Sequence, residues 1–471
     1  MFGLFAYDLI EGDKSSSLPP GFFFAKFFYF SLSMNSKNNK KTIRGWAMFD
    51  WANSAYNLVI TSTIFPAYYA IITTTQQHGD QVFFFGRQFT NTALSSYALS
   101  LAYLLMALLL PVLSSIADYR GNKKIFMQIF TYIGGVACAG LFFFRLETLE
   151  LGIICFTLAA MGYIGGVMFN NSYLPEIATP DQQDRVSAQG FAYGYVGSVL
   201  LQIICFAFVL KPELFGISDA SLPARLSFLL VGIWWISFAQ IPFKVLPAGS
   251  PNYKAVNKNM VKSGFQELQK VWQQLNEMKL LKRYLLAFFF YSMGVQTIML
   301  ASTGFGEKIL KLGTSKLIAT LLVIQLVAIL GALIMGYFAR KFGNLKVLIF
   351  VVIIWIGVCI SAFYISNEYQ FYVLAALVGL VMGGIQSISR STYSKLIPEK
   401  TPDTASFFSF YDVTEKMAIV IGLASFGFIE EFTGNMRISA LSLTAFFIIG
   451  LLVLISILFM KPAELKRLQP E

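Results

Sequence analysis

Long apolar runs, each followed by a short polar segment, occupy most of this 471-residue chain. A helix needs about 20 mostly apolar residues to cross the hydrocarbon core of a bilayer. Runs of this kind occur at about residues 46–73, 91–117, 125–145, 151–173, 186–210, 225–246, 283–303, 317–338, 346–366, 369–391, 413–432 and 437–460. They are too long and too uniformly apolar for strands of a membrane barrel. The pattern therefore predicts an all-α integral membrane protein with twelve spans.

One long polar segment, residues 247–282, divides the predicted spans into six and six. Its apolar residues recur at helical spacing among lysines and glutamates, which predicts an amphipathic helix at the membrane surface. We expect an N-terminal tail, a six-helix bundle, this linker, a second six-helix bundle and a C-terminal tail. Their boundaries are 1–45, 46–246, 247–282, 283–460 and 461–471.

The first 33 residues do not fit this organisation. Their apolar stretch is short, contains Lys26 and lacks a small-residue cleavage site, so it predicts neither a span nor a signal peptide. Met34 is followed by a polar, lysine-rich segment typical of a cytoplasmic start. We therefore expect translation to begin at Met34, with residues 1–33 absent from the mature protein.

The two predicted bundles resemble each other in sequence. A loop with a glycine and several basic residues follows the second span at 118–124, and a similar loop follows the eighth span at 340–346. Paired glycines recur in the fourth and tenth spans at nearly the same offset. Two repeats joined by a cytoplasmic linker are typical of secondary transporters, whose halves rock about a site at their interface.

The distribution of charge predicts the orientation. Only 13% of residues are charged, well below the roughly 25% usual in soluble domains, and the net charge is +11. Of the 36 basic residues, 28 lie in the tails and in the loops on their side of the predicted membrane. The positive-inside rule then predicts both termini in the cytoplasm and a multi-pass protein of the cytoplasmic (inner) membrane. Because the positive charge is a topology signal, we expect no nucleic-acid partner.

Several kinds of chemistry lack the residues that they need. The four cysteines lie far apart within apolar runs, His78 is the single histidine, and no phosphate-binding loop of the GxxxxGK[ST] type occurs. We therefore expect no metal, no cofactor and no enzymatic activity, including that of a membrane enzyme acting on lipids. A non-transporting sensor or a lipid-moving protein on the same scaffold is the alternative to a transporter.

The loop after the second span resembles the loop signature of the major facilitator superfamily, which combines an acid, a glycine turn and basic residues. An acid here can pair with an arginine, or it can sit at the positive N-terminus of a helix in the other half and lock one conformation. The alternative is an ordinary basic loop with an incidental acid. The lock residues that we expect are Asp118, Arg120, Gly121 and Lys124, with Arg340 and Gly343 in the second repeat. Since Arg340 replaces the acid, a lock there must be weaker or of opposite sign.

The first span carries a polar stripe. Asp50, Ser54, Asn57 and Thr61 follow a helical spacing, with Asn53 beside them. An acid within a span is a functional candidate by default, and the alternative for the amides and hydroxyls is hydrogen bonding between helices.

This span, GWAMFDWANSAYNLVITSTIFPAYY at residues 45–69, closely resembles the first-span signature of the vacuole-effluxer-like family of major facilitator proteins. Similar segments occur at residues 170–176, 185–197, 383–390 and 407–412. The resemblance implies a twelve-span major facilitator fold and transport by alternating access. It also implies amino acids as cargo, because the fungal relative exports them from the vacuole.

Further candidates lie in other spans. Asn170 and Asn171 precede Pro175 and Glu176, where a broken helix suits a gate; Glu176 is a proton-coupling group or a surface hinge residue. Arg390 follows Gln386 by one turn and is either an anion-binding group or an anchor at the cytoplasmic edge. Asp412 and Glu415 resemble a capping box that opens the eleventh span, with partnership to the basic loop as the other interpretation. Gln296 and Gln325 are mid-span candidates for a central cavity.

These observations predict a monomeric transporter that moves a small polar solute by alternating access, either driven by an ion gradient or by facilitated transport. We expect the solute between the first, fourth, seventh and tenth spans, near Asn53, Asn57, Asn170 and Gln296. Asp50 or Glu176 would titrate if a proton is coupled, and another ion is the alternative. The expected partners are thus the solute, a proton or other ion, and the lipid bilayer.

Overall fold

The computed structural model describes residues 37–74, 79–249, 260–399, 401–460 and 468. The expectations about residues 1–33 lie outside these ranges, as do those about most of the C-terminal tail. Within the described ranges the chain is almost entirely helical, which confirms the all-α membrane fold predicted from the apolar runs.

The first half of the chain contains six long helices. The first combines α2 (Lys40–Ala55), η1 (Tyr56–Ile64) and α3 (Phe65–Thr73). The others are α4 (Asn91–Arg120), α5 (Lys123–Gly140), α6 (Leu149–Asn171), α8 (Pro180–Leu210) and α9 (Leu222–Val245). Short helices η2 (Leu141–Phe143), η3 (Leu146–Thr148), α7 (Leu174–Ile177) and η4 (Pro212–Phe215) occur in the connections. A small antiparallel hairpin, β1 (Gln81–Phe84) and β2 (Arg87–Thr90), precedes α4 and pairs Gln81 with Thr90.

The second half repeats this pattern after a linker helix, α10 (Met260–Glu277). Its long helices are α11 (Lys279–Leu310), α12 (Thr314–Phe342), α13 (Asn344–Tyr364), α14 (Glu368–Leu396), α15 (Thr404–Thr433) and α16 (Met436–Leu458). Eleven of the described helical segments are long and apolar enough to cross a membrane. The remaining long helix, α15, carries Asp412, Glu415 and Lys416 in its first half and Glu430 and Glu431 near its end.

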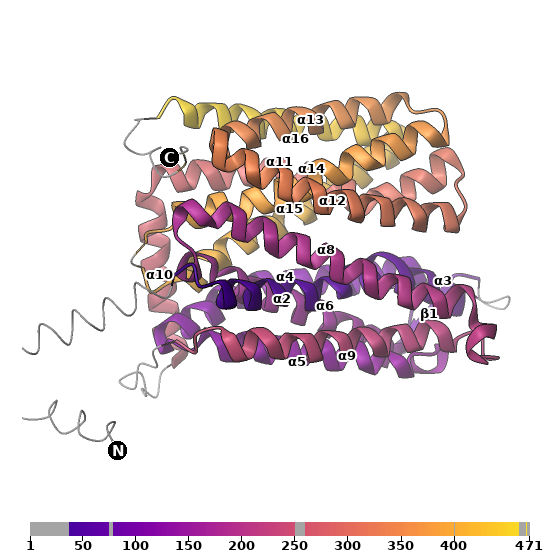
Figure 1. The fold of residues 1–471 in the computed structure, drawn as a ribbon. Coiled ribbons are helices and arrows are strands. Elements are labelled where there is room, and N and C mark those ends of the chain that lie inside the picture. The colour runs from indigo at the N-terminus through magenta and orange to yellow at the C-terminus, as the bar shows by residue number, and fades with distance from the viewer. Residues whose placement is uncertain (1–36, 75–78, 250–259, 400, 461–467, 469–471) are drawn as a thin grey trace, which may run out of the picture.

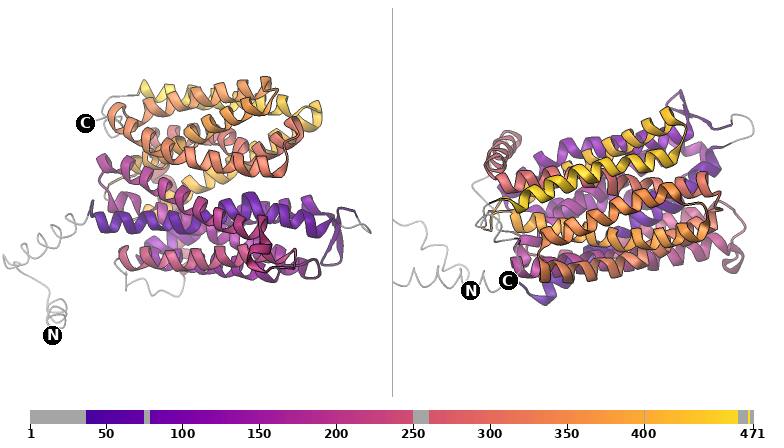
Figure 2. Two further views of the ribbon diagram at one scale, coloured as in Figure 1. Left: turned by 45° about the vertical axis from the view of Figure 1, so that its right-hand side comes forward. Right: turned by 90° about the horizontal axis from the view of Figure 1, so that it is seen from above.

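The helices of the two halves lie on opposite sides of the molecule (Figure 1). Figure 2 shows the same separation from another direction. Helix α10 lies across one end, which we call the α10 end, and the hairpin lies at the other, the hairpin end. The halves meet where α8 packs against α12 and α14 and where α4 packs against α15. Any site between the halves is therefore built by these helices and their neighbours.

Glycines let several helices approach closely. A Cβ on Gly383 of α14 would lie 2.1 Å from the Ala328 carbonyl oxygen of α12, and one on Gly331 would lie 2.0 Å from the Leu380 carbonyl oxygen. These distances are far below van der Waals contact, so only glycine fits at either position. Small residues at helix interfaces are the usual means of association within a bilayer, where apolar side chains gain little from leaving lipid.

The outer faces of the helices are apolar and exposed. Large side chains such as Leu108, Val136, Leu330 and Val373 are all more than half exposed. A contiguous apolar surface of this kind would be unstable in water, whereas in a bilayer it faces lipid tails. The outer surface thus agrees with the membrane class predicted from composition.

Helix α15 begins earlier than the apolar pattern predicts. The run suggested a start near residue 413 with Asp412 as its cap, but the helix begins at Thr404, so the capping interpretation is wrong. Asp412 lies two turns inside the helix. The reason is tertiary: the backbone N–H groups of Ala405 and Ser406 donate to the Asp118 carboxylate of α4, at 3.2 and 2.7 Å. An acid from the other half therefore caps α15.

Candidate functional site

A cavity of about 180 Å³ lies between the two halves. The first half lines it from α2, η1, α4, α6 and α8, and the second half from α11, α14 and α15. Its wall combines aliphatic side chains with tyrosines, amides, hydroxyls and five ionisable groups. Because both halves contribute polar groups, a molecule bound here would contact both of them.

The polar stripe of the first span reaches this cavity. Asp50, Asn53, Ser54 and Asn57 all line it. The stripe then changes course, because Tyr56–Ile64 is a π-helix and has more residues per turn than the α-helix on which the prediction was based. Ser62 lines the cavity instead of Thr61, and its hydroxyl donates to the Asn57 carbonyl oxygen at 2.9 Å.

An ion pair joins the halves at one side of the cavity. Arg390 Nη1 of α14 lies 3.0 Å from Asp50 Oδ2 of α2 and donates also to Asn171 Oδ1 at 2.9 Å. Arg390 Nε and Nη2 donate to the Ser187 hydroxyl and carbonyl oxygens. The guanidinium group packs over the rings of Trp46 and Phe191.

Arg390 is only 2% exposed. The interpretation as an anchor at the membrane edge is therefore wrong, because such an anchor must reach the interface. Asn170 supports the pair from the first half: its amide donates to Asp50 Oδ1 at 3.3 Å, and its carbonyl oxygen accepts from the Trp46 indole at 2.7 Å. Asn170 thus positions Asp50 without lining the cavity itself, whereas its neighbour Asn171 does line it.

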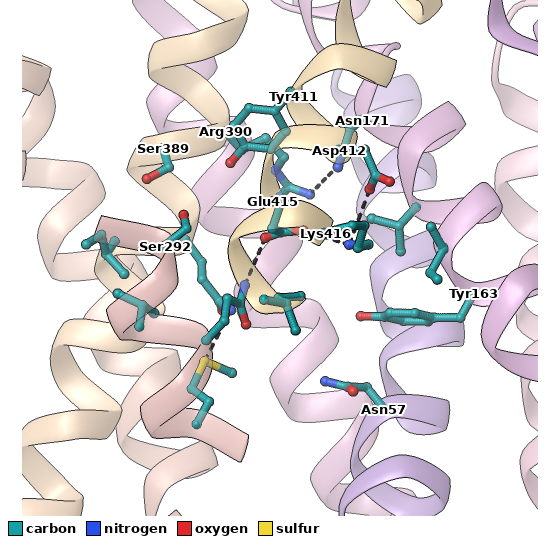
Figure 3. A pocket seen from close by; sticks show the side chains of 18 of the residues that line it. Asn57, Tyr163, Asn171, Ser292, Ser389, Arg390, Tyr411, Asp412, Glu415 and Lys416 are labelled. Atoms are coloured by element: carbon teal, nitrogen blue, oxygen red, sulfur yellow. Dashed lines mark hydrogen bonds and ion pairs between the residues drawn. The ribbon is translucent and has the colours of Figure 1, made fainter. Parts of the chain in front are cut away.

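A second ionic cluster comes from one helix. On α15, Lys416 Nζ lies 2.8 Å from Glu415 Oε2 and 3.4 Å from Asp412 Oδ1. Gln296 of α11 donates to Glu415 Oε1 at 2.9 Å. Figure 3 shows these three charged side chains close together, with Tyr163 and Asn57 of the first half beyond them. Asp412 and Glu415, which we considered as partners of the basic loop, instead line the cavity.

Two other predicted residues take different positions. Gln386 lines the cavity, where its side-chain oxygen accepts from the Tyr195 hydroxyl at 2.6 Å. Gln325 was expected in the cavity on the basis of its mid-span position, but it is not among the residues that line it. A mid-span position fixes depth in the membrane but leaves the direction of the side chain undetermined.

The α10 end is closed by contacts between the halves. Asp118 accepts hydrogen bonds at the N-terminus of α15, including one from the Ser406 hydroxyl at 2.7 Å. Beside it, Lys123 pairs with Glu176 at 2.5 Å, and both contact the Thr404 hydroxyl, at 3.1 and 2.8 Å. Glu176 therefore belongs to this closure and lies outside the central cavity.

The other lock candidates serve turns and local contacts. Gly121 has a left-handed backbone at the end of α4, as the turn requires, and Gly343 also has a positive φ. Lys124 donates to the Leu246 carbonyl oxygen within the first half. Arg340 is exposed and lies over the Tyr337 ring of its own helix. Arg120 ends α4 in a partly buried position.

Sequence reasoning missed a second closure. Lys395 Nζ of α14 lies 2.6 Å from Asp184 Oδ2 of α8, and the two side chains are 7% and 0% exposed. Asn344, at the start of α13, donates to Asp184 and accepts from Lys395, at 2.7 and 2.9 Å. In this pair the first half supplies the acid, Asp184, and the second half supplies the base, Lys395. Both residues lie in polar segments at the ends of predicted spans, where the sequence pattern does not indicate whether a charged side chain is buried.

Helix α10 is tied to this end. Lys270 pairs with Asp403 at 3.3 Å, just before α15 begins. Burial raises the pKa of Asp403 above its ordinary value, and the nearby Glu267 carboxylate raises it further. Along the described ranges, no group of three or more His, Cys, Asp or Glu side chains is placed to hold a metal ion.

Comparison with known proteins identifies the family. Residues 38–463 match the family model described as vacuole effluxer Atg22 like. This chain belongs to that family. It is 32% identical over 419 residues to an uncharacterised MFS-type transporter, YxiO, of Bacillus subtilis, covering 89% of this chain and 95% of that protein. It is 25% identical over 406 residues to autophagy-related protein 22 of Kluyveromyces lactis, covering 78% and 80%.

Solved structures agree on the fold. The outward conformation of the major facilitator transporter FucP superposes with a TM-score of 0.65 at 10% identity, covering 88% of this chain and 98% of that one. An outward-facing bacterial homologue of the iron transporter ferroportin gives 0.62 at 13% identity, covering 89% and 99%. The chain therefore has the major facilitator fold, and it is a multi-pass membrane protein of the MFS-type transporter class.

Proposed function

We propose that this protein carries a small polar solute, of the amino-acid class, across the cytoplasmic membrane by alternating access. The proposal rests on the cavity between the halves, to which both halves contribute polar groups, and on the ion pairs that join the halves at Asp50–Arg390 and Asp184–Lys395. A site shared by two similar bundles is what rocking transport requires. Because one chain supplies the whole cavity, the proposed transporter acts as a monomer.

The chemistry of the wall suits a zwitterion. Asn53 Nδ2 is buried and has no hydrogen-bond partner in the part of the chain that the structure describes, so a carboxylate could accept from it. The second half contributes the carboxylates of α15 to the same wall. Aliphatic residues such as Ile164, Val167 and Ile385 complete the wall and would accept an apolar side chain. An amino acid offers these three kinds of group together.

The orientation follows from the distribution of basic residues. Helix α10 and the loop after α4 lie at the α10 end, and both belong to the side of the membrane to which the sequence assigns most of the basic residues, so we assign that end to the cytoplasm. The cytoplasmic side is then closed in this conformation. Transport of the solute inward, or its capture from the cytoplasm, would require separation of Asp50 from Arg390 and of Asp184 from Lys395.

Asp50 is the proposed coupling residue. Its carboxylate accepts a hydrogen bond from Arg390 of the other half. Protonation of Asp50 would remove its negative charge and weaken this contact, which helps to keep the α10 end closed. A proton gradient would then bias the two conformations. A facilitative transporter would share the cavity but lack this dependence.

Solute flux into liposomes tests the proposal. The purified protein is reconstituted, loaded with a mixture of unlabelled amino acids and diluted into each labelled amino acid in turn. We expect exchange of at least one of them above protein-free liposomes. Absence of exchange for all of them, with the protein shown to be folded by thermal melting, would reject amino-acid transport and favour a sensor.

Proton coupling has its own control. We expect an imposed pH gradient to accelerate uptake in the wild type and to have no effect on Asp50→Asn. Asp80→Asn, which changes an exposed acid next to the hairpin, should behave as the wild type. Equal acceleration in all three proteins would remove Asp50 from the coupling mechanism.

A further inference from the structure

The cavity wall holds more acid than base. Its carboxylates are those of Asp50, Asp412 and Glu415, whereas its bases are Arg390 and Lys416. With every group ionised, one negative charge remains without a matching base. A charge that is poorly exposed to water is costly unless it is paired, so the location of this surplus matters.

The Asp50–Arg390 pair does not carry the surplus negative charge. Arg390 neutralises Asp50, and each of the three guanidinium nitrogens of Arg390 already donates to a partner. Its aromatic neighbours cover the faces of the group. Four of the five N–H groups of Arg390 thus have partners within the protein, and its charge is matched by that of Asp50, so the surplus charge lies with the α15 cluster.

Within that cluster, Asp412 has the carboxylate oxygen that lacks a hydrogen-bond partner among the described residues. Glu415 accepts from Gln296 on one oxygen and from Lys416 on the other. Asp412 Oδ1 lies 3.4 Å from Lys416, while Asp412 Oδ2 has no hydrogen-bond partner in the described ranges. The residue is 4% exposed and lines the cavity. A buried, unpaired carboxylate oxygen costs free energy that a bound donor would recover.

We propose that Asp412 binds the ammonium group of the transported solute, with Glu415 completing the negative pole and Lys416 lying between the two carboxylates. This inference rests on the proposed transport function and specifies which part of the cargo α15 recognises. One open oxygen suits an N–H donor, whereas a metal ion such as Ca²⁺ needs six or more oxygen ligands. Tyr163 and Tyr411 also line the cavity, and aromatic rings stabilise a nearby ammonium group.

Matched probes separate the two ends of a zwitterion. Valine, leucine and phenylalanine are each compared with the amine that lacks the carboxylate and with the acid that lacks the amine, for example isobutylamine and 3-methylbutanoate for valine. Binding to the purified full-length protein is measured by thermal stabilisation and by competition for labelled-substrate exchange. We expect the amino acids and the amines to bind, and the acids to bind at least 10-fold more weakly.

Variants locate the effect. Because hydrogen bonds to charged groups contribute about 1.5–3 kcal/mol, Asp412→Asn should weaken amine binding by roughly 10- to 100-fold, and Asp412→Glu should retain most of it. The matched control is Glu430→Gln, which changes a carboxylate of the same helix that pairs with Lys308 outside the cavity. It should bind amines as the wild type does.

Each outcome decides the question. Equal binding of acids and amines by the wild type overturns the inference without any variant, even if Asp412→Asn fails to fold. Unchanged amine binding by Asp412→Asn also overturns it. So does the finding that Asp412→Asn binds amines as the wild type does but no longer depends on an ion gradient. Exchange of solutes that have no amine would leave the proposed transport function standing while the ammonium site fails.

Discussion

The buried ion pair between Asp184 and Lys395 allows a quantitative test of the closed α10 end. The replacement Lys395→Met removes the base but keeps a side chain of similar length. In the closed conformation Asp184 is then a buried carboxylate without its counter-ion. In an open conformation water solvates the same carboxylate, so the substitution penalises only the closed state.

The magnitude follows from the contacts. Breaking a buried pair by removing one partner costs about 3–5 kcal/mol. Asp184 keeps one hydrogen bond, from Asn344 at 2.7 Å, so we take the lower end of this range, about 3 kcal/mol. At about 1.4 kcal/mol for each factor of ten, the open population should rise roughly 100-fold.

Cysteine labelling measures that population. Ser115 of α4 is fully buried and lies 3.3 Å from Ser406 of α15, so Ser115→Cys reports separation of the halves at the α10 end. The four native cysteines are buried and give a low background in the parent protein. With a slow maleimide reagent, the labelling rate follows the fraction of open protein, and we expect it to increase about 100-fold with Lys395→Met.

Two further variants make the test decisive. Lys316→Met removes an exposed pair with Glu368 inside the second half, and such pairs contribute about 1 kcal/mol or less, so labelling should change less than about fivefold. Asp184→Asn combined with Lys395→Met leaves no buried charge and should label more slowly than Lys395→Met alone. An unchanged rate in Lys395→Met, or a double variant that labels fastest of all, would refute the reasoning.

Three other expectations follow from the packing and the ion pairs. Asp118→Asn weakens the hydrogen bonds that cap α15, a loss of about 1–2 kcal/mol, and should raise labelling at Ser115→Cys about tenfold; no increase would show that Asp118 is not a lock. Gly383→Ala should lower the melting temperature, because its Cβ would meet a carbonyl oxygen of α12 at 2.1 Å, whereas Gly357→Ala, with open space around it, should not. Arg390→Lys keeps the charge but has one nitrogen for partners now held by three, so we expect exchange to fall at least tenfold, and wild-type exchange would contradict this.

The candidate site shows where sequence reasoning succeeds. Asp50, Asn53 and Asn57 were identified because a polar residue within an apolar run has few structural explanations, and all three line the cavity. The glycine turn at Gly121 was identified because a basic loop between two spans needs a sharp reversal. These signals are local, since each involves residues within a few turns of one another.

Other residues could not be placed in this way. Asp412 was interpreted as a helix cap because the apolar run starts after it, but Asp118 of the other half fills that role and moves the start of α15 back to Thr404. Asp184 and Lys395 are separated by more than 200 positions, and each is an ordinary charge in its own segment. Only their burial against each other shows that they form a contact between the halves.

The sequence by itself determined the membrane class, the helices and their repetition, because the bilayer imposes a length and a polarity on every span. It also determined the family, since the first-span segment and the loop signature are local patterns. The tertiary structure decided which polar groups meet, because packing of helices far apart in sequence sets the direction of each side chain. The pairing of Asp50 with Arg390, the cluster on α15 and the closure at Asp184 follow from that packing.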